Sequence, residues 1–84
     1  MVTGGRDKRE DSRYAEQARV LARVVREGRE KKRLTQVALA TKAEVSADWV
    51  AKLEQGRITE PGVFPVLAIL KVLRVSAKRL ESGE

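Results

Sequence analysis

Apolar residues along this chain recur at helical spacing, in clusters separated by polar or glycine-containing stretches. Near the start, four of them stand at i, i+4, i+7 and i+11, the spacing of one stripe along a helix: Tyr14, Ala18, Leu21 and Val25. This stripe predicts a long first helix from residue 12 or 13 to about residue 32. Residues 1–12 have almost no apolar side chains and carry mixed charge, so we expect a disordered tail there.

Residues 34–56 predict two short helices joined by a tight turn. Thr35 and Ser46 each suit the position just before a helix, because a side-chain hydroxyl accepts a backbone N–H group that has no partner in the first turn. Val50 and Leu53 share one face of the second helix, and Gly56 suits the left-handed conformation in which many helices end. Only residues 42–45 separate the two helices, which predicts the sharp turn of a helix-turn-helix unit.

The last third of the chain predicts a helix from residue 61 or 62 to about residue 73, and then a short final helix capped by Ser76. The longer helix is apolar around nearly its whole circumference, and a helix of that kind is buried on two sides. In so small a domain, we expect one side to pack inside the domain and the other to form a two-fold dimer interface. The residues predicted at this interface are Phe64, Leu67, Ala68, Lys71 and Val75. The alternative is that the second side packs within the chain, against the long first helix.

Composition excludes several classes of function. The chain has 84 residues, enough for one small domain with a single core. It contains no cysteine and no histidine, which removes disulfides, thiolate nucleophiles, histidine bases and histidine metal ligands. The sequence also shows no carboxylate pair and no glycine-rich phosphate loop. We therefore expect no catalytic residues, no metal and no cofactor, and hence no enzymatic activity.

Hydropathy and charge bear on the location of the protein and on its partner. The longest uninterrupted apolar run, residues 66–70, is far too short to cross a membrane, and the first ten residues contain no apolar signal segment. We expect a cytoplasmic protein without membrane contacts. The net charge of +6 and the pI near 10.2 favour a polyanionic partner, although many other soluble proteins are equally basic.

The joint spacing of residues across the chain resembles one family. The matching residues are Arg29, Leu34-Thr35-Gln36, Leu39-Ala40, Val45-Ser46, Val50, Leu53-Glu54 and Gly56, followed by Pro61, Leu73, Val75-Ser76 and Leu80. Over roughly residues 20–80 the chain is similar to the Cro/C1-type (xenobiotic-response-element-like) repressor family. The resemblance implies an all-α, compact five-helix domain over residues 13–84, with a central helix-turn-helix and a long first helix. Two residues depart from the family pattern: Glu44 replaces the usual turn glycine, and Gly28 replaces an apolar helix residue.

The resemblance also implies a function. It points to a sequence-specific transcriptional regulator that binds double-stranded DNA as a homodimer on a near-palindromic operator, with helix 46–55 in the major groove. The residues expected to read bases are Ser46, Ala47, Asp48 and Lys52. Those expected to contact phosphates are Thr35, Gln36, Gln55 and Arg57. Asp48 has an alternative role in complementing the helix dipole, and Gln36 has one in completing the helix cap.

Two further residues have an implied structural role. In the family, the arginine at the position of Arg29 pairs with the glutamate at the position of Glu54. A guanidinium matches a carboxylate with two parallel hydrogen bonds, so this pair would fix the angle between two helices. The alternative is an unpaired surface arginine. The N-terminal tail likewise has two interpretations: a solvated segment, or a basic arm that touches a DNA groove although its acidic residues cancel most of its charge.

A second functional hypothesis comes from the apolar face of helix 61–73. Here the protein would be a protein-interaction or antitoxin-like adaptor module, with DNA binding secondary. Under the first hypothesis the protein acts by occluding a promoter or by touching polymerase, whereas under the second its partner is another protein such as a toxin. A homodimer that forms with increasing concentration favours the first hypothesis, and a monomer with an adhesive surface favours the second.

Overall fold

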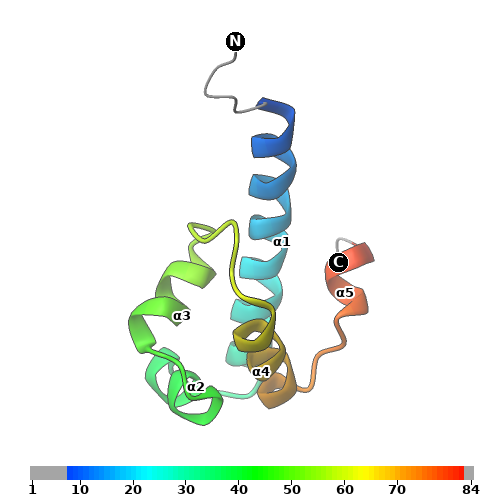
Figure 1. Cartoon of the computed structure of the whole chain (residues 1–84). Helices are drawn as coiled ribbons and strands as arrows, with labels where there is room; N and C mark the ends of the chain where they lie inside the picture. Colours follow the sequence, from blue (N-terminus) through cyan, green and yellow to red (C-terminus); the bar gives the residue numbers. More distant parts are fainter. Residues whose placement is uncertain (1–7, 83–84) are drawn as a thin grey trace.

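The computed structural model describes residues 8–82. Over this range the chain forms five helices and no strand, so the predicted all-α fold is confirmed. The helices are α1 (Lys8–Lys31), α2 (Gln36–Ala43), α3 (Ala47–Glu54), α4 (Val63–Leu73) and α5 (Lys78–Ser82). The four shorter helices lie around the C-terminal part of α1, and the first turns of α1 extend beyond them (Figure 1).

The first helix begins earlier than its apolar stripe predicts. Because α1 starts at Lys8, residues 8–12 are helical where a tail is expected, while residues 1–7 lie outside the described residues. An apolar stripe detects only the part of a helix that packs against something. Lysine, arginine and glutamate are strong helix formers, and they extend α1 toward its N-terminus without an apolar face.

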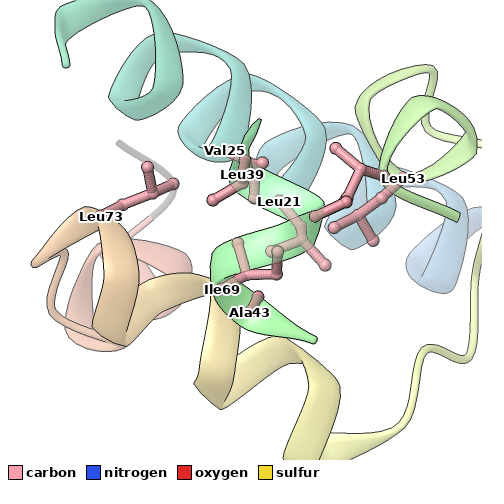
Figure 2. Packing of buried hydrophobic residues seen from close by; sticks show 9 residues of the cluster. Leu21, Val25, Leu39, Ala43, Leu53, Ile69 and Leu73 are labelled. Carbon is pink, nitrogen blue, oxygen red and sulfur yellow. The ribbon is translucent and has the colours of Figure 1, made fainter. Parts of the chain in front are cut away.

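The hydrophobic core lies where α2, α3 and α4 meet α1 (Figure 2). Nine buried residues form it: Leu21, Val25, Leu39, Ala40, Ala43, Val50, Leu53, Ile69 and Leu73. Burying a side chain the size of Leu39 or Ile69 contributes about 1.5–3 kcal/mol. Helices α2 and α3 have eight residues each, too few to be stable alone, so their conformation depends on this packing.

The turn between α2 and α3 forms without the glycine that the family pattern has. Glu44 adopts the left-handed conformation, with φ of 60°, and its backbone N–H is directed at the carbonyls of Ala40 and Thr41. The N–H of Val45 then donates to the Ala40 carbonyl at 2.9 Å. These bonds satisfy the last carbonyls of α2 and offset the roughly 1–2 kcal/mol that a left-handed conformation costs a residue with a side chain.

Gly28, the other departure from the family pattern, allows a close approach between helices. It is buried in α1, and a Cβ atom built on it would lie 3.2 Å from Cδ1 of Leu73 and 3.5 Å from Cγ2 of Val75. A side chain here would therefore require the Leu73 side chain to shift by a few tenths of an ångström. The loss of helix propensity at Gly28 is therefore offset by the packing of Leu73 into the core.

Candidate nucleic-acid interface

Both helices of the helix-turn-helix begin at a capping hydroxyl. Thr35 Oγ1 accepts the backbone N–H of Ala38 at 3.0 Å, and Ser46 Oγ accepts that of Trp49 at 3.0 Å. The two capping positions predicted from the sequence are therefore confirmed, and both residues remain exposed. A hydroxyl that accepts one bond still has its own proton to donate, so either group can also bond an oxygen of a ligand.

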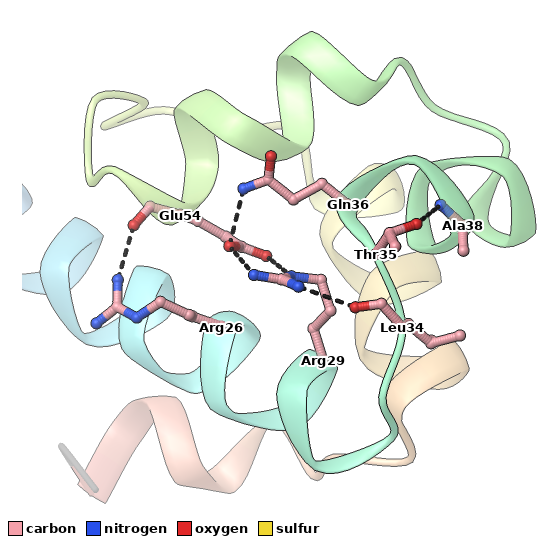
Figure 3. Close-up of polar contacts among 7 residues, drawn as sticks. All are labelled: Arg26, Arg29, Leu34, Thr35, Gln36, Ala38 and Glu54. Atoms are coloured by element: carbon pink, nitrogen blue, oxygen red, sulfur yellow. Dashed lines mark hydrogen bonds and ion pairs between the residues drawn. The ribbon is translucent and has the colours of Figure 1, made fainter.

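Arg29 of α1 and Glu54 at the end of α3 form an ion pair with two parallel hydrogen bonds (Figure 3). Arg29 Nε donates to Glu54 Oε2 at 2.6 Å, and Nη2 donates to Oε1 at 3.0 Å. The remaining nitrogen, Nη1, donates to the main-chain oxygen of Leu34 at 2.9 Å. One guanidinium thus holds the end of α3 and the segment that leads into α2, which fixes both helices relative to α1.

This ion pair is buried as well as bonded. Glu54 is only 5% exposed, so its charge is compensated by donors rather than by water. The hydrogen bond to Glu54 raises the pKa of Arg29 above its ordinary value, burial opposes that rise, and the charges of Glu54 and Glu30 add to it. Arg29 therefore stays charged at any physiological pH.

Two more side chains join the same cluster. Gln36 Nε2 donates to Glu54 Oε1 at 3.0 Å, and Arg26 Nη1 donates to the main-chain oxygen of Glu54 at 3.1 Å. We call Arg26, Arg29, Gln36 and Glu54 the clamp. The sequence did not predict Arg26, although its position three residues before Arg29 places both on one side of α1. Gln36, predicted to contact a phosphate, uses one amide proton inside the clamp and keeps a second.

The outward face of α3 carries the residues predicted to read bases. Ser46, Asp48 and Lys52 are exposed, whereas Ala47 is half-buried and packs against the core. Lys52 Nζ lies 3.1 Å from Asp48 Oδ2, so the two charged side chains pair with each other along the helix. Just past α3, Arg57 Nη1 donates to Gln55 Oε1 at 3.4 Å, and both residues are exposed.

The residues predicted at the dimer interface differ in exposure. Phe64 is 82% exposed and Leu67 is 48% exposed, and Lys71 is exposed too. Ala68 and Val75, however, are half-buried and pack against the core of their own chain, which leaves less of their surface for a partner. The helical spacing behind the prediction ends at Leu73, because Arg74 is left-handed with φ of 58° and turns Val75 toward Gly28.

A different apolar surface surrounds Phe64. Val63, at the start of α4, is 67% exposed and adds to the surface of Phe64 and Leu67. Beside it, an open groove of about 380 Å³ runs between α1, the start of α4 and α5, and its apolar lining includes Leu21, Val66, Leu67, Leu70 and Leu80. We call Val63, Phe64 and Leu67 the α4 patch.

Helices α2 and α3, with their capped starts, form a helix-turn-helix that the clamp holds against α1. Comparison with known families agrees with this description. A family model described as a helix-turn-helix domain matches residues 20–82. The chain belongs to the helix-turn-helix domain family. Domains of this family are DNA-binding and typically have no enzymatic activity, and the two helices of the motif here are α2 and α3. No curated protein and no solved structure matches the chain.

Residues 8–82 contain neither a membrane-spanning helix nor a metal-binding cluster of acidic residues. No helix in this part of the chain is both long and apolar enough to span a membrane. Its acidic side chains form no group of three or more that could hold a metal ion.

Proposed function

We propose that this protein is a sequence-specific regulator of transcription of the Cro/C1 type, which inserts α3 into the major groove of double-stranded DNA. The observation that carries the proposal is the contrast between the two sides of α3. Its inner side is fixed by Val50, Leu53 and the clamp residue Glu54, all of which are buried. Its outer side presents Asp48 and Lys52 to solvent, where they can meet base edges in a groove.

Phosphate contacts would come from both ends of the motif. At the start of α2, the Thr35 hydroxyl, the second amide proton of Gln36 and the free backbone N–H groups can donate to a phosphate. After α3, Gln55 and the guanidinium of Arg57 can contact the next phosphate along the strand. These contacts supply affinity without reading sequence, and they make the affinity fall steeply with salt.

The α4 patch supports a homodimer. Exposed apolar side chains such as Phe64 are costly in water, and a second copy would cover them by a two-fold contact. A symmetric pair would place its two α3 helices about one DNA turn apart, roughly 34 Å, on a near-palindromic operator. Repression would follow where such an operator overlaps a promoter, and activation where the bound dimer touches polymerase.

The experiment that tests the DNA-binding proposal is selection of bound sequences from random duplex DNA with the purified chain. A near-palindromic motif is the expected result. Titration at several salt concentrations then compares wild type with Arg57→Ala, which should reduce the slope of log K against log salt by about 0.9. Lys78→Ala, which removes an exposed cation from α5, is the matched control and should leave the slope unchanged. Failure to bind any duplex at low ionic strength would contradict the proposal.

Sedimentation equilibrium tests the dimer separately. The double variant Phe64→Ala/Leu67→Ala should weaken self-association, whereas Val37→Ala, which removes exposed apolar surface from α2, should not. The α4 patch also favours the second candidate function, an antitoxin-like or adaptor module that binds another protein. A wild-type chain that stays monomeric at every concentration, and that binds DNA weakly and without sequence preference, would favour that second function.

A further inference from the structure

The outward face of α3 holds a hydrogen-bond donor and an acceptor side by side. Lys52 Nζ and Asp48 Oδ2 are 3.1 Å apart, and their side chains are 49% and 76% exposed. This contact uses one carboxylate oxygen and one ammonium proton. A carboxylate offers about four acceptor sites and an ammonium three donors, so the pair keeps a free acceptor next to free donors.

A Watson–Crick base pair presents the complementary arrangement in the major groove. In a C·G pair the cytosine N4 donor adjoins the guanine O6 acceptor, and in an A·T pair the adenine N6 donor adjoins the thymine O4 acceptor. The two groups are joined by a hydrogen bond of the base pair itself, so they lie about 2.9 Å apart. That spacing is close to the 3.1 Å between the Asp48 and Lys52 atoms.

We infer that Asp48 and Lys52 act as one unit that reads a single C·G base pair. Asp48 accepts from cytosine N4, while Lys52 donates to O6 and N7 of the paired guanine. The inference rests on the proposed function, because it requires α3 to lie in the major groove. It names the base pair and its orientation: the cytosine belongs to the strand nearer Asp48.

The same geometry ranks the other three base pairs. An A·T pair keeps donor and acceptor in the correct order but replaces guanine N7 with the thymine methyl group, which cannot accept from an ammonium. The reversed pairs, G·C and T·A, set an acceptor oxygen against the Asp48 carboxylate. Affinity should therefore fall in the order C·G, then A·T, then the two reversed pairs.

Pairing also accounts for a carboxylate on a surface that would face phosphates. Alone, the charge of Asp48 would repel the DNA backbone. Neutralised by Lys52, it leaves a unit of no net charge whose contribution depends on the bases it meets. Asp48→Ala should consequently raise affinity for all sequences while losing discrimination, whereas Lys52→Ala should lower affinity for all sequences.

The test measures equilibrium binding of wild type, Asp48→Ala and Lys52→Ala to operators from the selection in which each base pair of one half-site is replaced in turn. Wild type should show one position at which C·G exceeds G·C by about tenfold or more, with A·T between them. Each single variant should lose most of that preference and keep the preferences at other positions. The double variant Asp48→Ala/Lys52→Ala should lose no more than either single variant, because the two residues act as one unit.

Two further variants sharpen the result. Glu44→Gln removes a carboxylate charge from the turn just before α3 and should leave the preference unchanged. Asp48→Asn should shift the preferred pair from C·G toward A·T, because an amide matches adenine N6 and N7. Sequence-specific binding that neither alanine variant alters at any position would overturn the inference and leave the proposed function standing. A wild type that binds no duplex would contradict the proposed function, and this inference with it.

Discussion

Two ion pairs lie on opposite sides of α3, and they differ in burial. On the inner side, Arg29 and Glu54 have side chains that are 15% and 4% exposed. On the outer side, Asp48 and Lys52 have side chains that are 76% and 49% exposed. The inner pair joins helices that are distant in sequence, whereas the outer pair joins two residues one turn apart in the same helix.

The difference in burial separates a structural role from a binding role. A charge held away from water needs its partner, because removing the partner leaves it without solvation. A charge in water loses little when its partner leaves, so exposed pairs one helical turn apart contribute only about 0.3–0.5 kcal/mol. Glu54 therefore has the structural role of holding α3 in place. Asp48 and Lys52 can form hydrogen bonds to a base with little loss of stability, because their mutual ion pair contributes little.

The largest expected effect is that of Glu54→Ala. It removes the carboxylate to which Arg29 and Gln36 donate, and we expect a loss of about 3 kcal/mol in the free energy of unfolding, since breaking a buried pair typically costs 3–5 kcal/mol. For a domain of this size the melting temperature should fall by more than about 10 °C. Thermal and urea unfolding followed by circular dichroism measure both quantities.

Affinity for DNA should fall together with that stability, because α3 loses its fixed position. Glu16→Ala, which removes an exposed carboxylate from α1, is the matched control and should change the free energy of unfolding by less than about 0.5 kcal/mol. If Glu54→Ala lowered affinity alone and left stability unchanged, the structural role of the clamp would be wrong.

An intermediate effect is expected for Gln36→Ala, because Gln36 belongs to the buried clamp and is also expected to contact DNA. Its amide donates to Glu54, so its loss should cost about 1 kcal/mol of stability. If the second amide proton also contacts a phosphate, the affinity for DNA measured well below the melting temperature should fall further than in a stability-matched core variant such as Ile69→Val, which removes one buried methyl group at a cost of about 1 kcal/mol. Equal affinities in the two variants would restrict Gln36 to the clamp.

Local patterns were enough to predict the motif itself. Capping by Thr35 and Ser46 and the left-handed Gly56 depend on residues within one helical turn, and the structure has all three. The buried positions Val50 and Leu53 follow from helical spacing for the same reason. A single sequence contains such short-range information directly.

Local patterns did not predict where the chain turns after a helix, or which residues distant in sequence come into contact. Helical spacing extended past Leu73 predicts Val75 on the α4 face, but the left-handed Arg74 ends that spacing and turns Val75 onto α1. Arg26 bonds a main-chain oxygen of α3, and a carbonyl has no signature in the sequence. The glycine at position 28 is explained by the packing of Leu73 against it, a contact between residues far apart in the sequence.

A small effect on stability is expected at the outer pair. Asp48→Ala, Lys52→Ala and the double variant should each change the free energy of unfolding by less than about 0.5 kcal/mol, and the coupling from the double-mutant cycle should be about 0.3–0.5 kcal/mol. Urea unfolding of the four proteins measures this coupling. A coupling as large as that of the inner pair would abolish the distinction between the two sides of α3 and would make Lys52 a structural residue.

The smallest expected effect is that of pH on the inner pair: the contribution of Arg29 to the free energy of unfolding should not change between mildly and moderately alkaline pH. Because the hydrogen bond to Glu54 raises the pKa of Arg29, its contribution to stability is fully present below the pKa of an arginine in the unfolded chain, and it is lost only as pH rises through the still higher folded value. From about pH 8 to about pH 10, the difference in unfolding free energy between wild type and Arg29→Ala should therefore stay constant. Urea unfolding at several pH values in this window measures that difference. A steady decline would mean that Arg29 is not the group whose charge holds Glu54, because no arginine in such a pair releases its proton there.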